Sequence, residues 1–359
     1  RVLSPHSEKY MSIVDTPEVT PERARYYDRI RDHGLSPLWM VFNRLITREP
    51  KSQCHPHLWR YDILKPLLME AGELITAREA ERRVLILENP GMPDSGRITT
   101  SLYAGLQLVL PGELAPAHRH SQSALRFVVD GDGAYTAVNG ERTLMSPGDF
   151  VITPPWTWHD HGNESDAPMI WMDGLDIPVL QFFDASFAEP YGEEEQPVTR
   201  KTGDSLARYG ANMLPVDFER TRLASPIFNY PYDRSREAID RMRRQDEWDP
   251  CHGLKLRYIN PVDGDAAMPT ISAFIQLLPN GFNTAAYQST DATVFSVVEG
   301  RGYSIIAGDR FDWTPRDTFV APSWALVTHH PAEESVLFSF SDRICQQKLG
   351  IFREQRHDA

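Results

Sequence analysis

The chain has 359 residues and a formal net charge of −13, from 37 Lys and Arg against 50 Asp and Glu. This length suggests two domains, and the acidic balance argues against nucleic-acid binding, which needs a basic face. The apolar runs are too short to cross a membrane, and three widely spaced cysteines do not make a disulfide framework. The first ten residues lack the apolar stretch of a signal peptide, so a cytoplasmic protein is expected.

The N-terminal part of the chain is predicted to be helical. Helices are expected over residues 21–33, where Gly34 ends the pattern, over 64–71 and over 77–83. Thr76 is the expected N-cap of the third helix, with Glu79 at the capping-box position. Cys54 and His57 have metal-binding side chains, but no second pair follows at zinc-finger spacing, so a loop is expected there.

From residue 97 the pattern becomes that of short strands bounded by Gly, Pro, Asn or Asp. Strands are expected over residues 98–110, 124–129, 133–138, 150–153 and 169–175. Asn139-Gly140 predicts a two-residue type I′ hairpin turn. Residues 191–201 are typical of a solvated connector, and a charged helix is expected over 235–247. Strand pattern returns from 271 to about 340.

The two strand-rich blocks resemble copies of each other. Phe127-Val-Val-Asp-Gly-Asp-Gly133 matches Ser296-Val-Val-Glu-Gly-Arg-Gly302. Ser146-Pro-Gly-Asp-Phe-Val-Ile-Thr-Pro-Pro-Trp156 matches Thr314-Pro-Arg-Asp-Thr-Phe-Val-Ala-Pro-Ser-Trp324 at nearly the same offset. An internal duplication of one β domain is therefore predicted.

His118 and His120 lie two residues apart on an expected strand, so both imidazoles project from the same face. His159 is the third candidate ligand. Three imidazoles that converge in a small barrel can hold a divalent metal and leave positions open for substrate.

These residues resemble the two motifs of the cupin superfamily. Gly112, His118, His120 and Gly131 match the first motif, and Gly148, Pro154, His159 and Asn163 match the second. Ala124 stands in place of the family's glutamate ligand, and Trp156 in place of a glycine. Without the carboxylate the metal keeps its full charge, which favours an anionic substrate that supplies its own oxygens.

The resemblance implies a mainly β bicupin fold, two β-barrel (jelly-roll) domains with an N-terminal helical arm and a helical connector. We expect the arm at residues 1–96, cupin 1 with the metal at 97–182 and the connector at 183–262. Cupin 2 is expected at 263–345 and a C-terminal tail at 346–359. In cupin 2 the ligand positions become Tyr287, Ser289 and Val327, which build no metal site, and His329 and His330 are expected to be packing or surface residues. Cupin 2 is therefore expected to be structural.

Longer segments resemble the gentisate 1,2-dioxygenase family, which includes salicylate and 1-hydroxy-2-naphthoate dioxygenases. They are Ser101–Glu113, Ala117–Phe127 and Trp156–Asn163, with His57–Tyr61 and Glu79–Pro90 in the arm. The resemblance implies Fe(II), dioxygen, a small aromatic carboxylate as substrate and a homotetramer. It implies cleavage of gentisate to maleylpyruvate, with salicylate or 1-hydroxy-2-naphthoate as alternative substrates.

Several residues are candidates for substrate contact or catalysis. Arg126 lies six residues beyond His120, on the same face by strand parity, and its guanidinium fits a carboxylate. Arg82 and Gln107 are suggested by the resemblance, although Arg82 also fits a solvated helix face. Gly105 shares the strand of Gln107, and Tyr103 is either a pocket wall or an aromatic core residue.

His161 is either a proton shuttle or a packing histidine, and Asp173 is expected to fix His161 or to contact a ring hydroxyl. Two readings from other classes remain open at this point. Three histidines and a water also serve zinc hydrolysis, and a bicupin storage or sensing protein needs no catalytic metal.

Overall fold

The computed structural model describes residues 17–245 and 248–358, and it divides the chain into two compact units, 1–51 and 52–359. The first unit contains α1 (Pro21–Arg31) and α2 (Leu38–Leu45). Helix α1 starts where Thr20 Oγ1 accepts a hydrogen bond from the Arg23 backbone, and Gly34, at φ 70°, follows its end. Helix α2 was not expected from the sequence.

Two helices precede the first jelly roll in the second unit. Helix α3 (Tyr61–Leu74) is longer than the predicted 64–71 and buries Leu68 completely. Helix α4 begins at Ala77 with the predicted capping box of Thr76 and Glu79. It ends at Ala80 rather than at 83, because Glu81 takes a left-handed φ of 53° and turns the chain away.

The first jelly roll consists of two sheets, one of six strands and one of five, rather than one closed barrel. The six-stranded sheet has the order β12-β8-β5-β10-β3-β2 and the five-stranded sheet the order β11-β4-β9-β6-β7. Their strands are β2 (Val84–Ile86), β3 (Tyr103–Val109), β4 (Leu114–His120), β5 (Ala124–Asp130), β6 (Ala134–Val138), β7 (Glu141–Leu144), β8 (Phe150–Thr153), β9 (His159–Asn163), β10 (Met169–Leu175), β11 (Ala188–Pro190) and β12 (Asn229–Tyr230).

The second jelly roll repeats this plan, which confirms the predicted duplication. Its sheets have the orders β1-β19-β16-β21-β14-β13 and β18-β17-β20-β15-β22. Their strands are β1 (His57–Trp59), β13 (Leu254–Arg257), β14 (Ser272–Leu278), β15 (Tyr287–Ser289), β16 (Thr293–Glu299), β17 (Gly302–Ile306), β18 (Asp309–Trp313), β19 (Thr318–Ala321), β20 (Val327–Pro331), β21 (Ser335–Ser341) and β22 (Glu354–Arg356).

Short edge strands from outside each repeat complete the sheets. Strand β1 precedes the first jelly roll in the chain, yet it pairs with β19 of the second. In the same way β12, from the connector, pairs with β8 of the first, and β11 pairs with β4. Residues 52–96 and the connector therefore contribute edge strands to the sheets of the two jelly rolls.

The connector carries helices as well as edge strands. They are α5 (Ile177–Phe182), α6 (Asp204–Tyr209) and α7 (Tyr232–Met242), which continues as a 3-10 turn (Arg243–Gln245), and α8 (Arg343–Lys348) follows the last long strand. The helix predicted over 235–247 thus starts earlier than expected, and its last two residues lie outside the described part of the chain. The 191–201 segment is largely exposed, as expected, except for buried Gln196, which hydrogen-bonds to Gly140 and Ala137.

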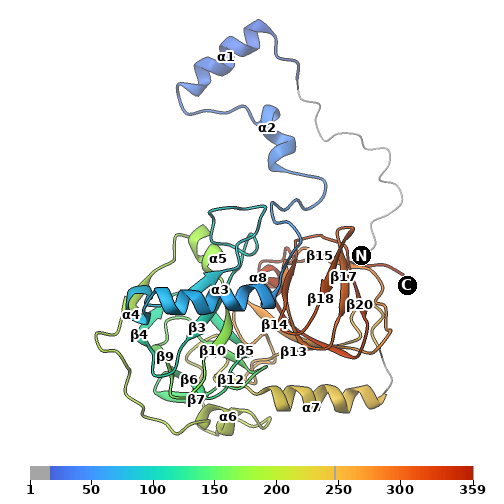
Figure 1. The fold of residues 1–359 in the computed structure, drawn as a ribbon. Coiled ribbons are helices and arrows are strands. Elements are labelled where there is room, and N and C mark those ends of the chain that lie inside the picture. The colour runs from blue at the N-terminus through green and yellow to red at the C-terminus, as the bar shows by residue number, and fades with distance from the viewer. Residues whose placement is uncertain (1–16, 246–247, 359) are drawn as a thin grey trace. The chain divides into compact units, whose positions relative to one another are not determined.

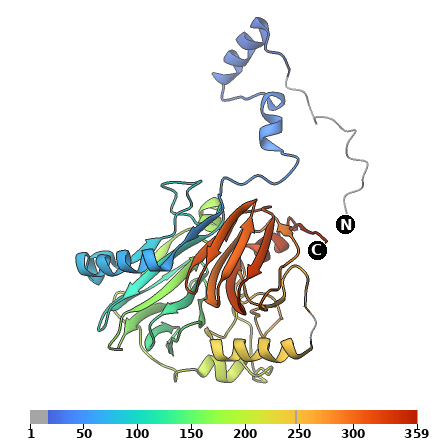
Figure 2. The same cartoon turned by 45° about the vertical axis from the view of Figure 1, so that its right-hand side comes forward.

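The two jelly rolls lie side by side and share one hydrophobic core (Figures 1 and 2). Phe127 on β5 stacks on Phe338 of β21, with ring centroids 4.0 Å apart and an angle of 6° between the planes. The predicted Asn139-Gly140 turn is confirmed, with φ of 49° and 81°. The expected strand over 98–110 begins only at Tyr103.

Candidate metal centre

Strand β4 presents two histidines to the space between the two sheets. His118 and His120 are two residues apart on this strand, and their ring centroids are 5.4 Å apart. Each ring places Nδ1 near a backbone carbonyl, 3.2 Å from Pro116 for His118 and 3.1 Å from Gln122 for His120. A carbonyl only accepts, so these contacts favour the tautomer with the proton on Nδ1 and a free lone pair on Nε2.

Strand β9 brings a third histidine to the same place. His159 pairs with His118 across the two strands, and its ring lies 4.2 Å from that of His118 and 4.8 Å from that of His120. Its Nδ1 is 2.9 Å from the Thr157 carbonyl, and its buried Nε2 has no hydrogen-bond partner.

The three rings offer ligand atoms that all lie within 4.8 Å of one another. Burial lowers the pKa of His118 to about 3 and that of His120 to about 4, and it holds that of His159 well below its ordinary value. The imidazoles are therefore neutral, which metal ligation requires. The buried Nε2 of His159 is unpaired, and the imidazoles of His118 and His120 lie beside it. One divalent ion would satisfy this nitrogen, so the three residues fit a metal ion.

Arg126 of β5 is buried beside this trio. Its Nη1 donates to Thr153 Oγ1 at 2.7 Å, and its Nε lies 3.7 Å from Asp173 Oδ1. Among the residues that the structure describes, Nε has no hydrogen-bond partner. Burial lowers the pKa of Arg126 to about 10, which still leaves it charged at neutral pH. The guanidinium therefore keeps donor capacity for an anionic ligand.

Arg82 reaches the histidines because the predicted helix over 77–83 does not form there. The turn at Glu81 redirects the chain, and Arg82 Nη2 lies 2.5 Å from His118 Nδ1 and 2.7 Å from the Pro116 carbonyl. The alternative of a solvated helix face is wrong. Arg82 Nη2 donates to the Pro116 carbonyl, and its positive charge beside the ring helps to lower the pKa of His118.

Asp173 does not fix His161, contrary to one of the two expectations. It accepts a hydrogen bond from Trp171 Nε1 at 3.0 Å and faces Arg126. Burial raises its pKa to about 6, although Arg126 opposes the shift. His161 instead places Nδ1 3.0 Å from Thr136 Oγ1, and its buried Nε2 is unpaired. Burial and repulsion from Arg126 hold the pKa of His161 well below 6.5, so this ring is neutral too.

Strand β3 supplies the remaining candidates from one face. Tyr103 and Gly105 pair with Leu175 and Asp173 of β10, and Gln107 pairs with Trp171. A side chain at Gly105 would meet Val84 Cγ1 at 2.4 Å and the Tyr103 hydroxyl at 3.1 Å, so glycine is needed here for the close packing of β3 against β2. Gln107 also lines a cavity of about 10 Å³ with Arg83 and Glu113.

Two residues depart from the cupin motifs without disturbing the site. Ala124 is buried at the start of β5, where the family has a carboxylate. Trp156 takes a left-handed φ of 57°, the region that favours glycine, and its ring lies under the guanidinium of Arg119 at 4.5 Å.

The second jelly roll carries the same frame with different side chains. Tyr287 pairs with Val327 as His118 pairs with His159. His329, expected to be a packing residue, is buried with Nδ1 2.8 Å from Ser304 Oγ, and it repeats the contact of His161 with Thr136. His330 stacks on Tyr303 with centroids 4.5 Å apart.

Sequence reasoning missed three contacts that hold the site together. They come from Thr136, Thr153 and Trp171, which bond to His161, Arg126 and Asp173 respectively. Strand pairing is the feature that could have revealed these contacts, since Thr136 lies opposite His161 and Arg126 lies opposite Asp173. That register could not be read without knowing which strands pair.

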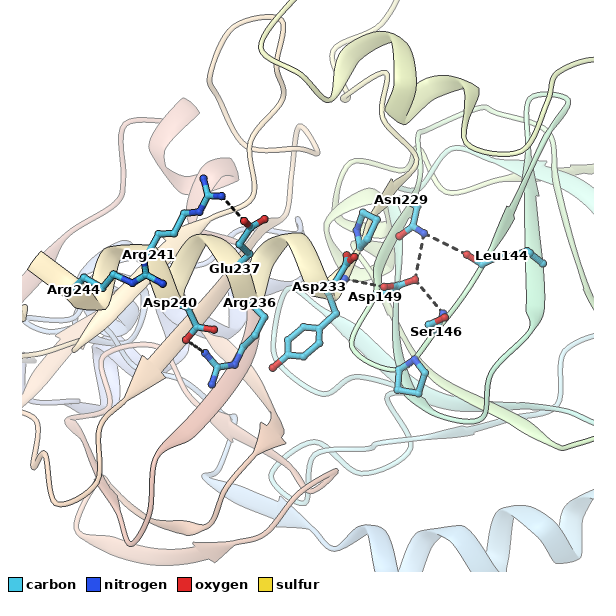
Figure 3. Close-up of a pocket in the computed structure, with 13 residues that line it drawn as sticks. Leu144, Ser146, Asp149, Asn229, Asp233, Arg236, Glu237, Asp240, Arg241 and Arg244 are labelled. Carbon is cyan, nitrogen blue, oxygen red and sulfur yellow. Dashed lines mark hydrogen bonds and ion pairs between the residues drawn. The ribbon is translucent and has the colours of Figure 1, made fainter.

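A groove of about 940 Å³ lies elsewhere, between α7 and the turn before β8 (Figure 3). It contains none of the predicted site residues. Asp149 accepts hydrogen bonds there from the Ser146 and Tyr232 backbones, and Asn229 bonds to it from β12 (Figure 3). These contacts attach the connector to the first jelly roll.

Among the residues that the structure describes, no helix is long and apolar enough to cross a membrane. The cupin domain family matches residues 105–177. Gentisate 1,2-dioxygenase 1 of Aquipseudomonas alcaligenes is 65% identical, over 97% of this chain and 100% of its own length. A gentisate 1,2-dioxygenase of Ralstonia sp. is 35% identical, over 92% and 93%. The structure of salicylate 1,2-dioxygenase from Pseudoaminobacter salicylatoxidans in adducts with gentisate has a TM-score of 0.89 at 35% identity and covers 96% of each chain.

Proposed function

Because the chain belongs to the gentisate 1,2-dioxygenase family of cupin enzymes, we propose that it is an Fe(II)-dependent ring-cleaving dioxygenase that converts gentisate (2,5-dihydroxybenzoate) to maleylpyruvate. Both atoms of dioxygen enter the product. One observation carries the proposal: three neutral imidazoles lie near a buried arginine that has an unpaired donor. A metal and an anion clamp side by side suit a substrate with a carboxylate next to a phenolic oxygen.

His118, His120 and His159 are the proposed ligands of the iron. When bound, Fe(II) supplies the path by which an electron-rich ring passes electron density to dioxygen. The three backbone carbonyls at Nδ1 fix the ring orientations before any metal arrives. Three histidines also suit zinc, so iron is proposed from the family and is tested by metal analysis.

Arg126 is proposed to bind the substrate carboxylate. Thr153 and Asp173 hold the guanidinium from two sides, so its orientation is set before the substrate binds. Arg82, which contacts His118, adds a second positive charge near the same carboxylate. Gly105 and Gln107 shape the wall formed by β3.

His161 is proposed to accept and return a proton during ring cleavage. Thr136 holds its Nδ1, and the unpaired Nε2 is the atom that would exchange the proton. The lowered pKa keeps the ring neutral, so the lone pair of a ring nitrogen is free to accept a proton. Its place on the same strand face as His159, with ring centroids 5.6 Å apart, brings it close to the metal ligands.

Tyr103 is proposed to recognise the 5-hydroxyl, which gentisate has and salicylate lacks. Its hydroxyl lies next to the Gly105 backbone, and no hydrogen bond to it is found among the described residues. A polar group left unpaired by the smaller substrate discriminates against that substrate. This position favours gentisate over salicylate or 1-hydroxy-2-naphthoate. We further propose a homotetramer, on the strength of the family resemblance; a cytoplasmic location stays a prediction.

The direct test follows dioxygen uptake by iron-loaded protein with gentisate, salicylate and 1-hydroxy-2-naphthoate. We expect uptake and a ring-opened product with gentisate, and a lower kcat/KM with the other two acids. Arg126→Gln is expected to raise KM or abolish turnover while the protein still binds one iron. Protein that binds iron yet consumes no dioxygen with any of the three acids would overturn the proposal.

A further inference from the structure

The second jelly roll encloses a cavity of about 30 Å³ at the place that corresponds to the metal centre of the first. Its lining includes Tyr287, Ser289 and Val327, which occupy the positions of the three histidine ligands. Phe295 takes the position of Arg126, because β16 repeats β5. The cavity therefore has neither the metal ligands nor the anion clamp of the first jelly roll.

A lysine side chain lines this cavity instead. Lys255 comes from β13, the counterpart of β2, and pairs with Gln276 on β14. Its Nζ lies 4.8 Å from the ring centroid of Phe274 and 5.9 Å from that of Phe295. In the described part of the chain, no carboxylate lies within ion-pair distance of this ammonium group and no hydrogen bond to it is found.

The nearby carboxylates are already occupied by other cations. Asp291 lies 3.2 Å from Arg343 Nε, and Asp249 lies 2.6 Å from Arg356. Arg343 also donates to the Tyr287 hydroxyl at 2.6 Å. His252 and His329, which line the cavity as well, are neutral, because burial lowers the pKa of each to about 3. The charges of Asp291 and Arg343 cancel each other. Lys255 therefore gives the cavity lining one positive charge that no carboxylate compensates.

Lys255 is half-buried, and burial together with the charge of Arg343 lowers its pKa to about 8, so holding the positive charge at this place has a cost. At neutral pH the amine is still mostly protonated. An anion beside it would remove the cost, as a metal satisfies the unpaired nitrogens of the first jelly roll.

We propose that the second jelly roll binds one small monovalent anion, of the size of chloride, against the ammonium group of Lys255. The volume of the cavity limits which anions can bind in it. A cavity of about 30 Å³ is roughly a fifth of the ~150 Å³ that accepts a benzene ring, so aromatic acids do not fit. It exceeds the ~10–15 Å³ that one water needs, which leaves room for a halide. Anion binding here is a separate property from ring cleavage.

The first test is a crystal soaked in sodium bromide, with the anomalous signal of bromide as the readout. We expect a bromide peak in hydrogen-bond distance of Lys255 Nζ in the wild-type protein and no peak there in Lys255→Met. A wild-type cavity that contains only water at saturating bromide would overturn the proposal.

The second test compares thermal unfolding of the full-length protein in sodium chloride and in sodium gluconate of equal ionic strength, since gluconate is too large for the cavity. Saturating chloride is expected to raise the Tm of the wild type by about 3 °C. Lys255→Met should show no such rise and should be at least as stable as the wild type in gluconate. Lys201→Met, which removes an exposed lysine, is the control and should respond like the wild type. Equal chloride responses in wild type and Lys255→Met would contradict the proposal.

Discussion

The chemistry of the metal centre depends on the second nitrogen of each imidazole. In His118, His120 and His159 the Nδ1 atom meets a carbonyl from a residue two positions away in the chain. This local contact aims Nε2 at the common point. The residue types and the two-residue spacing of His118 and His120 could be read from the sequence. The carbonyl contacts could not, because they depend on backbone direction.

Arg82 shows most clearly why the sequence left two interpretations open at this scale. The charged run over 77–83 has the composition of a solvated helix, and only the left-handed Glu81 turns Arg82 toward His118. A non-glycine residue has little intrinsic preference for a positive φ. The packing around such a residue therefore determines whether it adopts this conformation. The same argument covers Trp156, and its counterpart Trp324 at φ 64°.

Tyr103→Phe tests the recognition of the second hydroxyl. Loss of one hydrogen bond to the substrate is expected to lower kcat/KM for gentisate about 10- to 100-fold and to leave kcat/KM for salicylate nearly unchanged. Steady-state dioxygen uptake with both acids measures the ratio. Tyr303→Phe, a tyrosine of the second jelly roll, is the matched control. Equal losses for both acids would show that Tyr103 is a packing residue.

At the scale of elements, strands with clear turn residues on both sides were predicted well, and the edge strands were missed. Periodicity located β8 and β10 at their observed bounds, since each is flanked by turn residues. Edge strands such as β1 and β12 have three residues or fewer, too few for a period to appear. They nonetheless decide how the arm and connector attach, because each one pairs with a sheet of a jelly roll.

An ion pair adds to the strand pairing that holds β2 near the turn between β3 and β4. Arg83 is buried and forms two hydrogen bonds with Glu113, of 2.8 and 2.7 Å, and a third with the Ile75 carbonyl. Burial raises the pKa of Glu113, but hydrogen bonds from Arg83 and the Leu110 backbone outweigh this and lower it below 4.5. A lowered carboxyl pKa means that the ionised form stabilises the fold at neutral pH.

Glu113→Gln is expected to lower the free energy of unfolding by about 3 kcal/mol at pH 7, because it leaves the charge of Arg83 buried without a partner. The difference should be present above pH 4.5 and should shrink as the pH falls through the lowered pKa, when wild-type Glu113 also becomes neutral. Urea denaturation over a pH series from 7 down to about 2.5 measures it. A difference that stays constant across the whole series would exclude the ion pair as the cause.

On the scale of the whole molecule, the second jelly roll supports the site without providing a ligand. Phe338 packs on Phe127, the neighbour of Arg126 on β5, so the strand that carries Arg126 packs against the other jelly roll. The duplication itself was visible in the sequence through its repeated turn motifs. The shared core was not, because contacts between repeats leave no spacing pattern.

Phe338→Ala is expected to destabilise the protein by about 3–5 kcal/mol and to weaken gentisate turnover, although Phe338 lies in the jelly roll without the metal site. Both jelly rolls should unfold in one transition that is shifted to lower temperature. Differential scanning calorimetry and dioxygen uptake measure the two effects. Phe282→Ala, which removes a ring packed in the second jelly roll's own cluster, should leave KM for gentisate unchanged. A Phe338→Ala protein with wild-type kinetics would show that the site does not depend on this support.

The most direct test of this account is the iron content of the protein after anaerobic loading with Fe(II), measured by mass spectrometry. Gentisate-dependent dioxygen uptake is recorded on the same samples. The account predicts one iron for each wild-type chain, and uptake that rises in proportion to the iron bound. It predicts neither iron nor uptake for His159→Ala, whereas His330→Ala behaves like the wild type. A His159→Ala protein that keeps its iron and its activity would contradict the assignment of the metal to the first jelly roll.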